Sequence, residues 1–118
     1  MKQGDIVAAY KTLSVLNRKP GLPFGIIQKL FLKKKELEPF WQMQGEQETV
    51  LIEATGQKVE DYELTTEIKK GLLALSNSDV EYTGKPVEIT VTADLAEKLG
   101  LTAQMLEHLD GFVTFTEG

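Results

Sequence analysis

Apolar residues recur every three or four positions through the first half of the chain, which is the spacing of one face of a helix. From Asp5 to Leu16 this pattern predicts a first helix, with the Asp5 carboxylate as its N-cap. Pro20 should end that segment, because proline disfavours helical angles at the residue before it. A second series of the same period opens at Pro23, a residue that suits the first turn of a helix. The N-terminal half is therefore expected to form a pair of helices.

The length of the second helix depends on Pro39, which lies inside its apolar series. Proline removes a backbone hydrogen bond, so we expect a kink or a short break near Glu38. Residues 48–54 fit either a strand or the last turns of the helix. An unbroken helix from Pro23 to Thr55 would be about 50 Å long. That is long for one 118-residue domain, so the sequence favours a break at Pro39 or cover from a partner chain.

The second half of the chain mixes the helical period with the two-residue alternation of strands. In chain order, the expected elements are a helix at 61–75, strands at 80–82 and 86–92, short helices at 93–99 and 102–109, and a strand at 112–115. The first two strands are expected to form a hairpin across residues 83–85. These elements predict an α+β fold, in which an N-terminal helical pair and a third helix pack on a small C-terminal β element with two short helices. At this length we expect one domain over residues 1–118.

The two short helices at 94–109 resemble a helix-turn-helix, because leucines surround a glycine turn at Gly100. A strand, two short helices and a closing strand also follow the order of a winged helix. The residues that would contact DNA are Lys98, Thr102 and Gln104. Phosphate contacts need cations, yet the second helix has no Lys or Arg and carries Glu107. A DNA-binding regulator is therefore kept only as the alternative function.

The amino-acid composition excludes several kinds of catalytic and binding site. Thirteen basic and eighteen acidic residues give a net charge of −5, which disfavours nucleic acid as a partner. The chain has no cysteine and a single histidine, His108, so thiolate sites and multi-imidazole metal sites are excluded. No serine stands in a nucleophile motif and no phosphate-binding glycine loop is present. We expect no enzyme activity and no cofactor, in a cytoplasmic protein without a membrane segment or signal peptide.

The most distinctive surface signal is a group of lysines beside aromatic residues in the second helix. Consecutive residues fan around a helix, and Glu36 and Glu38 follow the lysines, so a solvated helix face is the simpler interpretation. The aromatic side chains, in contrast, present more apolar surface than one helix can bury. A partner helix or a second copy would cover it. The candidate interaction surface comprises Lys29, Phe31, Lys33, Lys34, Lys35, Phe40 and Trp41.

The run from Asp5 to Leu16, followed by Leu22-Pro23 opening a Lys/Glu-rich helix, resembles short uncharacterised proteins encoded by bacteriophages and prophages. Those proteins combine a first helix, a basic turn, a long charged helix, a strand of alternating valines and a closing helix. The corresponding parts of this chain are residues 9–16, 24–55, 87–92 and 101–106. The chain departs from the pattern at Pro39 and at residues 84–86. The resemblance implies a phage setting, in the cytoplasm of the host cell, and no catalytic mechanism.

Together these patterns predict a non-enzymatic, phage-type interaction protein that self-associates. Its partners would be a second copy of itself and another protein. Two roles fit equally: assembly of the virion, or binding of a host factor or signal molecule to block a defence. The alternative is the helix-turn-helix or winged-helix regulator that uses residues 94–109.

Overall fold

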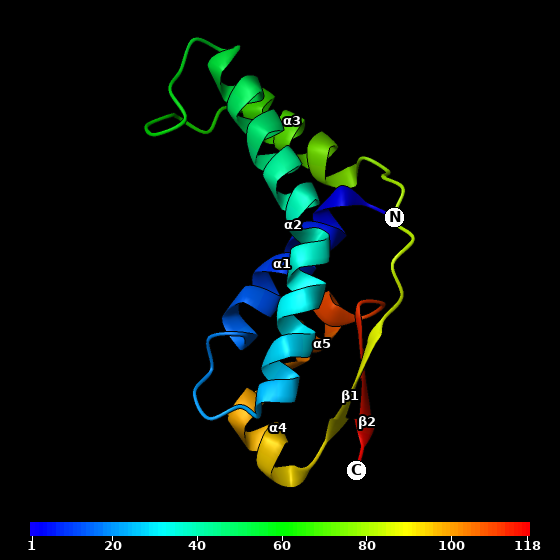
Figure 1. The fold of residues 1–118 in the computed structure, drawn as a ribbon. Coiled ribbons are helices and arrows are strands. Elements are labelled where there is room, and N and C mark those ends of the chain that lie inside the picture. The colour runs from blue at the N-terminus through cyan, green and yellow to red at the C-terminus, as the bar shows by residue number, and fades with distance from the viewer.

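The computed structural model describes residues 1–118 and confirms an α+β fold with five helices and one two-stranded sheet. The elements are α1 (Gln3–Leu16), α2 (Phe24–Glu53), α3 (Thr66–Asn77), β1 (Val87–Val91), α4 (Ala93–Leu99), α5 (Ala103–Leu109) and β2 (Val113–Glu117). Helix α2 runs along most of the molecule, with α3 beside its C-terminal half and the remaining elements around its N-terminal half (Figure 1). The molecule is elongated, with extents of 52 × 28 × 22 Å.

The predicted helical pair is present as α1 and α2, which run in opposite directions side by side. Helix α1 is the centre of the core, because its apolar stripe is completely buried at Ile6, Ala9 and Leu13. The turn between the helices is fixed by Asn17, whose side-chain amide donates to the Ile27 carbonyl at 3.1 Å. Burial of this apolar stripe, rather than helix propensity alone, holds the pair together.

Of the kink or short break expected near Glu38, the break is wrong, since α2 is one helix of 30 residues with Pro39 inside it. Pro39 and Lys35 are both exposed, so water can satisfy the Lys35 carbonyl that the proline leaves without a helical donor. On the opposite side of α2, Leu37 and Gln44 are buried and hold the helix in place. Residues 48–54, which fit a strand or a helix, lie in the last turns of α2 and its C-cap. Helix α3 covers part of this segment from within the same chain.

Helix α3 begins later than predicted, at Thr66 instead of Asp61. The Thr65 hydroxyl accepts from the Ile68 amide at 3.2 Å and caps the helix. Tyr62, inside the predicted range of the helix, precedes α3 and is 36% exposed. The helix packs closely on α2 at Gly71, where an added Cβ would lie 2.5 Å from Leu51 Cδ2. 

The predicted hairpin of residues 80–82 with 86–92 is wrong. Strand β1 instead pairs in parallel with β2, with Val87 opposite Val113 and Val91 opposite Glu117. Residues 80–82 extend past the N-terminus, where the Val80 amide donates to the Met1 carbonyl at 2.8 Å. The parallel pairing with β1 accompanies burial of Val113 in the core, where it is 6% exposed.

The two short helices predicted at 93–99 and 102–109 are confirmed as α4 and α5. The Thr92 and Thr102 hydroxyls cap them by accepting amides of their first turns. Gly100 has φ +58°, a left-handed conformation that glycine adopts without strain, and it turns the chain between the helices. Leu99 and Leu109 are completely buried. This corner therefore closes one end of the core and forms the crossover between the parallel strands.

Candidate functional site

The residues of the predicted interaction surface do not share one face of α2. Lys33 is buried, and Phe40 packs against the core. Phe31 is 43% exposed, on a different side of the helix. Lys29 donates to the Glu88 carbonyl of β1 at 2.9 Å. Because successive residues of a helix point about 100° apart, a continuous run of lysines and aromatics is divided among several surroundings.

Lys33 contradicts the interpretation of the lysines as a solvated helix face, because its side chain is only 1% exposed. Its ammonium donates to Glu36 Oε2 at 2.7 Å, to the Tyr82 hydroxyl at 2.9 Å and to the Lys85 carbonyl at 2.7 Å. These three bonds use all three ammonium protons. Gly84 lies so close that an added Cβ would collide with Glu36 and Tyr82. This Lys33 cluster joins α2 to the extended segment before β1.

The electrostatics of the Lys33 cluster are those of a structural site. Burial lowers the pKa of Lys33, but the hydrogen bonds to Glu36 and Tyr82 outweigh it, and the pKa lies above its ordinary value of 10.5. Burial also raises the pKa of Tyr82 above its ordinary 10.0, although the bond from Lys33 opposes this. Both groups therefore stay protonated at neutral pH. Neither has the pKa near neutrality that suits a general acid or base.

The two other predicted aromatic residues are partly covered by the chain itself. Trp41 stacks on Tyr10 of α1, with ring centroids 4.8 Å apart, and remains 39% exposed. Phe40 meets Tyr82 edge to face at 6.0 Å. The Lys34 ammonium lies 5.7 Å from the Tyr10 ring. These three side chains of α2 thus contribute to packing between elements.

The exposed apolar surface of α2 lies on the side away from α1. We call it the outer face of α2, and it comprises the exposed Phe24, Phe31, Leu32, Pro39 and Val50 together with the half-buried Met43. Phe24 is 77% exposed, Leu32 58% and Val50 68%. Single exposed apolar residues are ordinary in folded proteins, but several along one helix face indicate an interaction surface. Of the predicted residues, Phe31 belongs to this face and Lys35 borders it.

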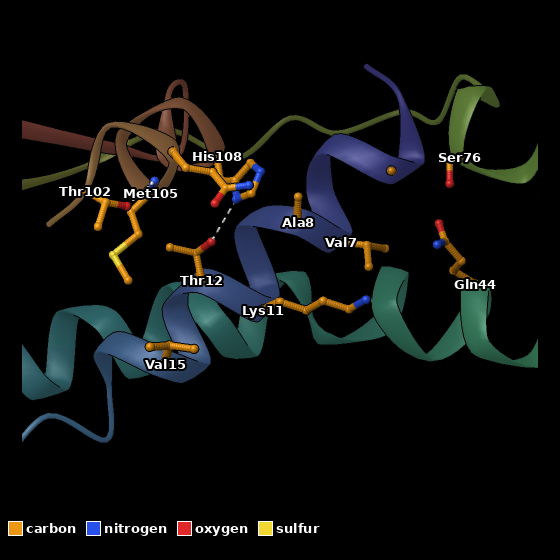
Figure 2. A pocket seen from close by; sticks show the side chains of 12 residues that line it. Val7, Ala8, Lys11, Thr12, Val15, Gln44, Ser76, Thr102, Met105 and His108 are labelled. Carbon is orange, nitrogen blue, oxygen red and sulfur yellow. Dashed lines mark hydrogen bonds between the residues drawn. The ribbon is translucent and has the colours of Figure 1, made fainter. Parts of the chain in front are cut away.

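A second feature, which the sequence did not indicate, is an open cleft of about 530 Å³ between α1 and α5 (Figure 2). Its walls are apolar at Val7, Val15 and Met105 and polar at Lys11 and His108. The Thr12 hydroxyl and His108 Nδ1 lie 3.3 Å apart, which links the two helices across one side of this α1–α5 cleft. Its lining comes from segments that are far apart along the chain, so no local pattern marks it.

The residues proposed to contact DNA in the alternative function do not form an exposed basic surface. Lys98 pairs with Asp94 at 3.1 Å within α4. Thr102 and Gln104 line the α1–α5 cleft. A winged helix follows its recognition helix with antiparallel wing strands, whereas β1 and β2 are parallel. The geometry therefore offers little support for a recognition helix.

Comparisons with known proteins do not assign a function. A scan against protein-family models finds no match, and searches of curated proteins and of solved structures find no similar protein. No helix of the structure is both long enough and apolar enough to cross a membrane. Function must therefore be inferred from the residues and geometry of this chain.

Proposed function

We propose that this chain is a non-enzymatic, phage-type interaction protein that self-associates through the outer face of α2. The observation that carries the proposal is the exposure of Phe24, Leu32 and Val50 along one side of a single long helix. Covering such a surface removes apolar area from water, at roughly 25 cal/mol per Å². A second copy would bury the same residues on both partners. The protein would act as an assembled unit, either in the virion or on a host factor.

Oligomeric state tests this proposal directly. Light scattering coupled to size exclusion at micromolar concentration should give a mass above that of the 13.1 kDa chain. The double variant Leu32→Ser and Val50→Ser should shift the protein toward monomer. Leu106→Ser is the matched control, since Leu106 is 46% exposed but lies on α5. A wild-type protein that stays monomeric up to high micromolar concentration would refute self-association.

The α1–α5 cleft favours a second function, the binding of a small signal molecule. Its volume of about 530 Å³ lies within the range typical of ligand sites, roughly 300–1,000 Å³. The apolar walls beside Lys11, which forms no salt bridge, suit an anionic molecule with an apolar portion. 

The fluorescent probe anilinonaphthalene sulfonate has this chemistry and serves as the test ligand for the cleft. Binding is measured in the Leu32→Ser, Val50→Ser background, so that the outer face of α2 does not contribute. Lys11→Gln should weaken binding several-fold, whereas Lys70→Gln, an exposed lysine on α3, should not. Equal binding by both variants would remove the cleft as the site.

A further inference from the structure

Four apolar residues of the outer face of α2 are spaced symmetrically along the helix. Leu32, Pro39, Met43 and Val50 follow one another at intervals of seven, four and seven positions. With 3.6 residues per turn, these intervals keep the four residues within about 20° of one line along the helix. The middle of this stripe is at the level of residue 41. A twofold rotation about an axis perpendicular to the helix at that level places Leu32 at the position of Val50, and Pro39 at the position of Met43.

The two halves of α2 carry net charges of opposite sign. The N-terminal half carries four lysines, at 29 and 33–35, against Glu36 and Glu38, which leaves a net charge of +2. The C-terminal half carries only acidic charges, at Glu46, Glu48 and Glu53, a net charge of −3. Two copies of α2 in antiparallel orientation would bring each basic half against an acidic half. A parallel pair would place like charges together, which is unfavourable. Charge therefore selects the antiparallel orientation.

One pair of charges fits this arrangement in detail. Lys35 and Glu46 lie on the same flank of the apolar stripe, about 20° apart around the helix. The twofold axis at the level of residue 41 places residue 47 of the second copy opposite Lys35, and Glu46 is the residue before it. In a twofold pair the same flanks face each other, so Lys35 of one copy would reach Glu46 of the other, twice. The Lys35 side chain is 54% exposed; its ammonium pairs with Glu38 at 3.0 Å and lies 5.7 Å from the Phe31 ring. Glu46 forms no salt bridge in its own chain.

We propose that a second copy of this chain docks antiparallel on the outer face of α2, across a twofold axis at the level of residue 41. Leu32 then meets Val50, Pro39 meets Met43, and Lys35 pairs with the partner's Glu46. This inference rests on the proposed self-association and specifies its geometry. The interface is isologous and closes at two copies, because each copy presents the same patch to the other.

The extent of this interface sets its strength. With its centre at residue 41, the two helices overlap from residue 29 to residue 53, about 36 Å of helix. A strip about 12 Å wide on each copy would bury roughly 900 Å² in total. Interfaces of that size belong to weak or transient complexes. We therefore expect a dimer that dissociates in the micromolar range.

Cysteine cross-linking tests the orientation cleanly, because the native chain has no cysteine. Leu32→Cys and Val50→Cys proteins, mixed and oxidised, should give a disulfide-linked dimer. Each variant alone should give little, since its two copies of the cysteine would lie about 27 Å apart along the paired helices. Leu106→Cys mixed with Val50→Cys is the control for random collision. A parallel pair would instead cross-link each single variant with itself.

Charge exchange tests the Lys35–Glu46 pairing in solution. Lys35→Glu and Glu46→Lys should each weaken the dimer roughly tenfold, because each replaces two attractive pairs by two repulsive ones. The double variant should recover most of the wild-type affinity. Circular dichroism of each variant confirms that the monomer is folded.

The possible failures of the two proposals can be told apart. A dimer whose mixed cysteine variants do not cross-link, or whose double charge variant is no tighter than the single ones, overturns the antiparallel geometry and leaves self-association standing. A protein that is monomeric at every accessible concentration overturns both.

Discussion

Replacing Lys33 by methionine would remove the buried ammonium but keep a side chain of similar length. The Tyr82 hydroxyl and the Lys85 carbonyl would lose a charged donor, while Glu36, whose side chain is 40% exposed, could turn to water. A hydrogen bond to a charged group contributes about 1.5–3 kcal/mol. Removing the charge also relieves its desolvation, which offsets part of that loss. We expect Lys33→Met to lower the free energy of unfolding by about 2 kcal/mol.

The raised pKa of Lys33 indicates that Lys33→Met lowers, and does not raise, the free energy of unfolding. That pKa lies above its ordinary value of 10.5 even though burial lowers it, so the hydrogen bonds stabilise the ammonium by more than its desolvation costs. Net stabilisation of the charged form means that its removal should destabilise the fold. For a domain of this size, 2 kcal/mol corresponds to a fall in Tm of about 8 °C.

Urea unfolding followed by circular dichroism measures the effect, and a loss of 2 kcal/mol should move the midpoint by about 1 M. The matched control is Lys34→Met, because Lys34 is the next residue of the same helix and only approaches the Tyr10 ring. It should cost less than about 1 kcal/mol. If Lys33→Met is as stable as the wild type or more stable, the hydrogen bonds do not outweigh desolvation and the reasoning fails.

Three further predictions follow from the geometry. Gly4→Ala would place a Cβ 2.9 Å from the backbone of α3, so we expect thermal unfolding to show a loss of about 1–3 kcal/mol; an unchanged Tm would mean that the helices separate freely. Gly100→Ala should lower the free energy of unfolding in urea by about 1 kcal/mol, because alanine is strained at the φ of +58°. Gly45→Ala, at an open position inside α2, should raise that free energy by about the same amount. Equal effects of the two substitutions would show that Gly100 is not needed for its left-handed conformation. The pKa values of Lys33 and Tyr82 are both raised, so their contribution to stability is complete below about pH 10 and lost as pH rises through the raised values. Urea midpoints of the wild type should therefore fall above pH 10, and less in a Lys33→Met, Tyr82→Phe variant that lacks both titrating groups; parallel curves would show that the cluster does not cause the fall.

The elements whose signals are local could be predicted from the amino-acid sequence. The hydroxyls of Thr92 and Thr102 lie one residue before α4 and α5, and each accepts an amide of its own helix. Gly100 supplies a left-handed turn between them, and no other part of the chain is needed to define it. The periods of α1 and of the start of α2 likewise identify helices. Caps and periods depend on neighbours within a few residues, which the sequence contains. The cap expected at Asp5 is nevertheless wrong, because α1 begins at Gln3 and its N-cap is Lys2.

Features that depend on what lies opposite a residue in space could not be predicted from local patterns. Pro39 should break a helix, but it lies on the exposed side, and packing on the opposite side keeps α2 whole. The pattern of Val87 to Val91 predicts a strand but not its partner, which proved to be β2 instead of residues 80–82. Strand alternation specifies which side chains share a face, whereas pairing depends on which distant strand completes the core.

The same limit applies to the candidate site. The sequence placed Lys33, Lys34 and Lys35 in one charged run, but it could not say which of the three would lie against Tyr82 and become buried. Only the positions of α1 and of the segment before β1 made that choice. The exposed stripe of the outer face of α2 was defined in the same way, by what the other elements left uncovered. Composition and period give a helix its apolar residues, and the neighbouring elements determine which of those residues remain available to a partner.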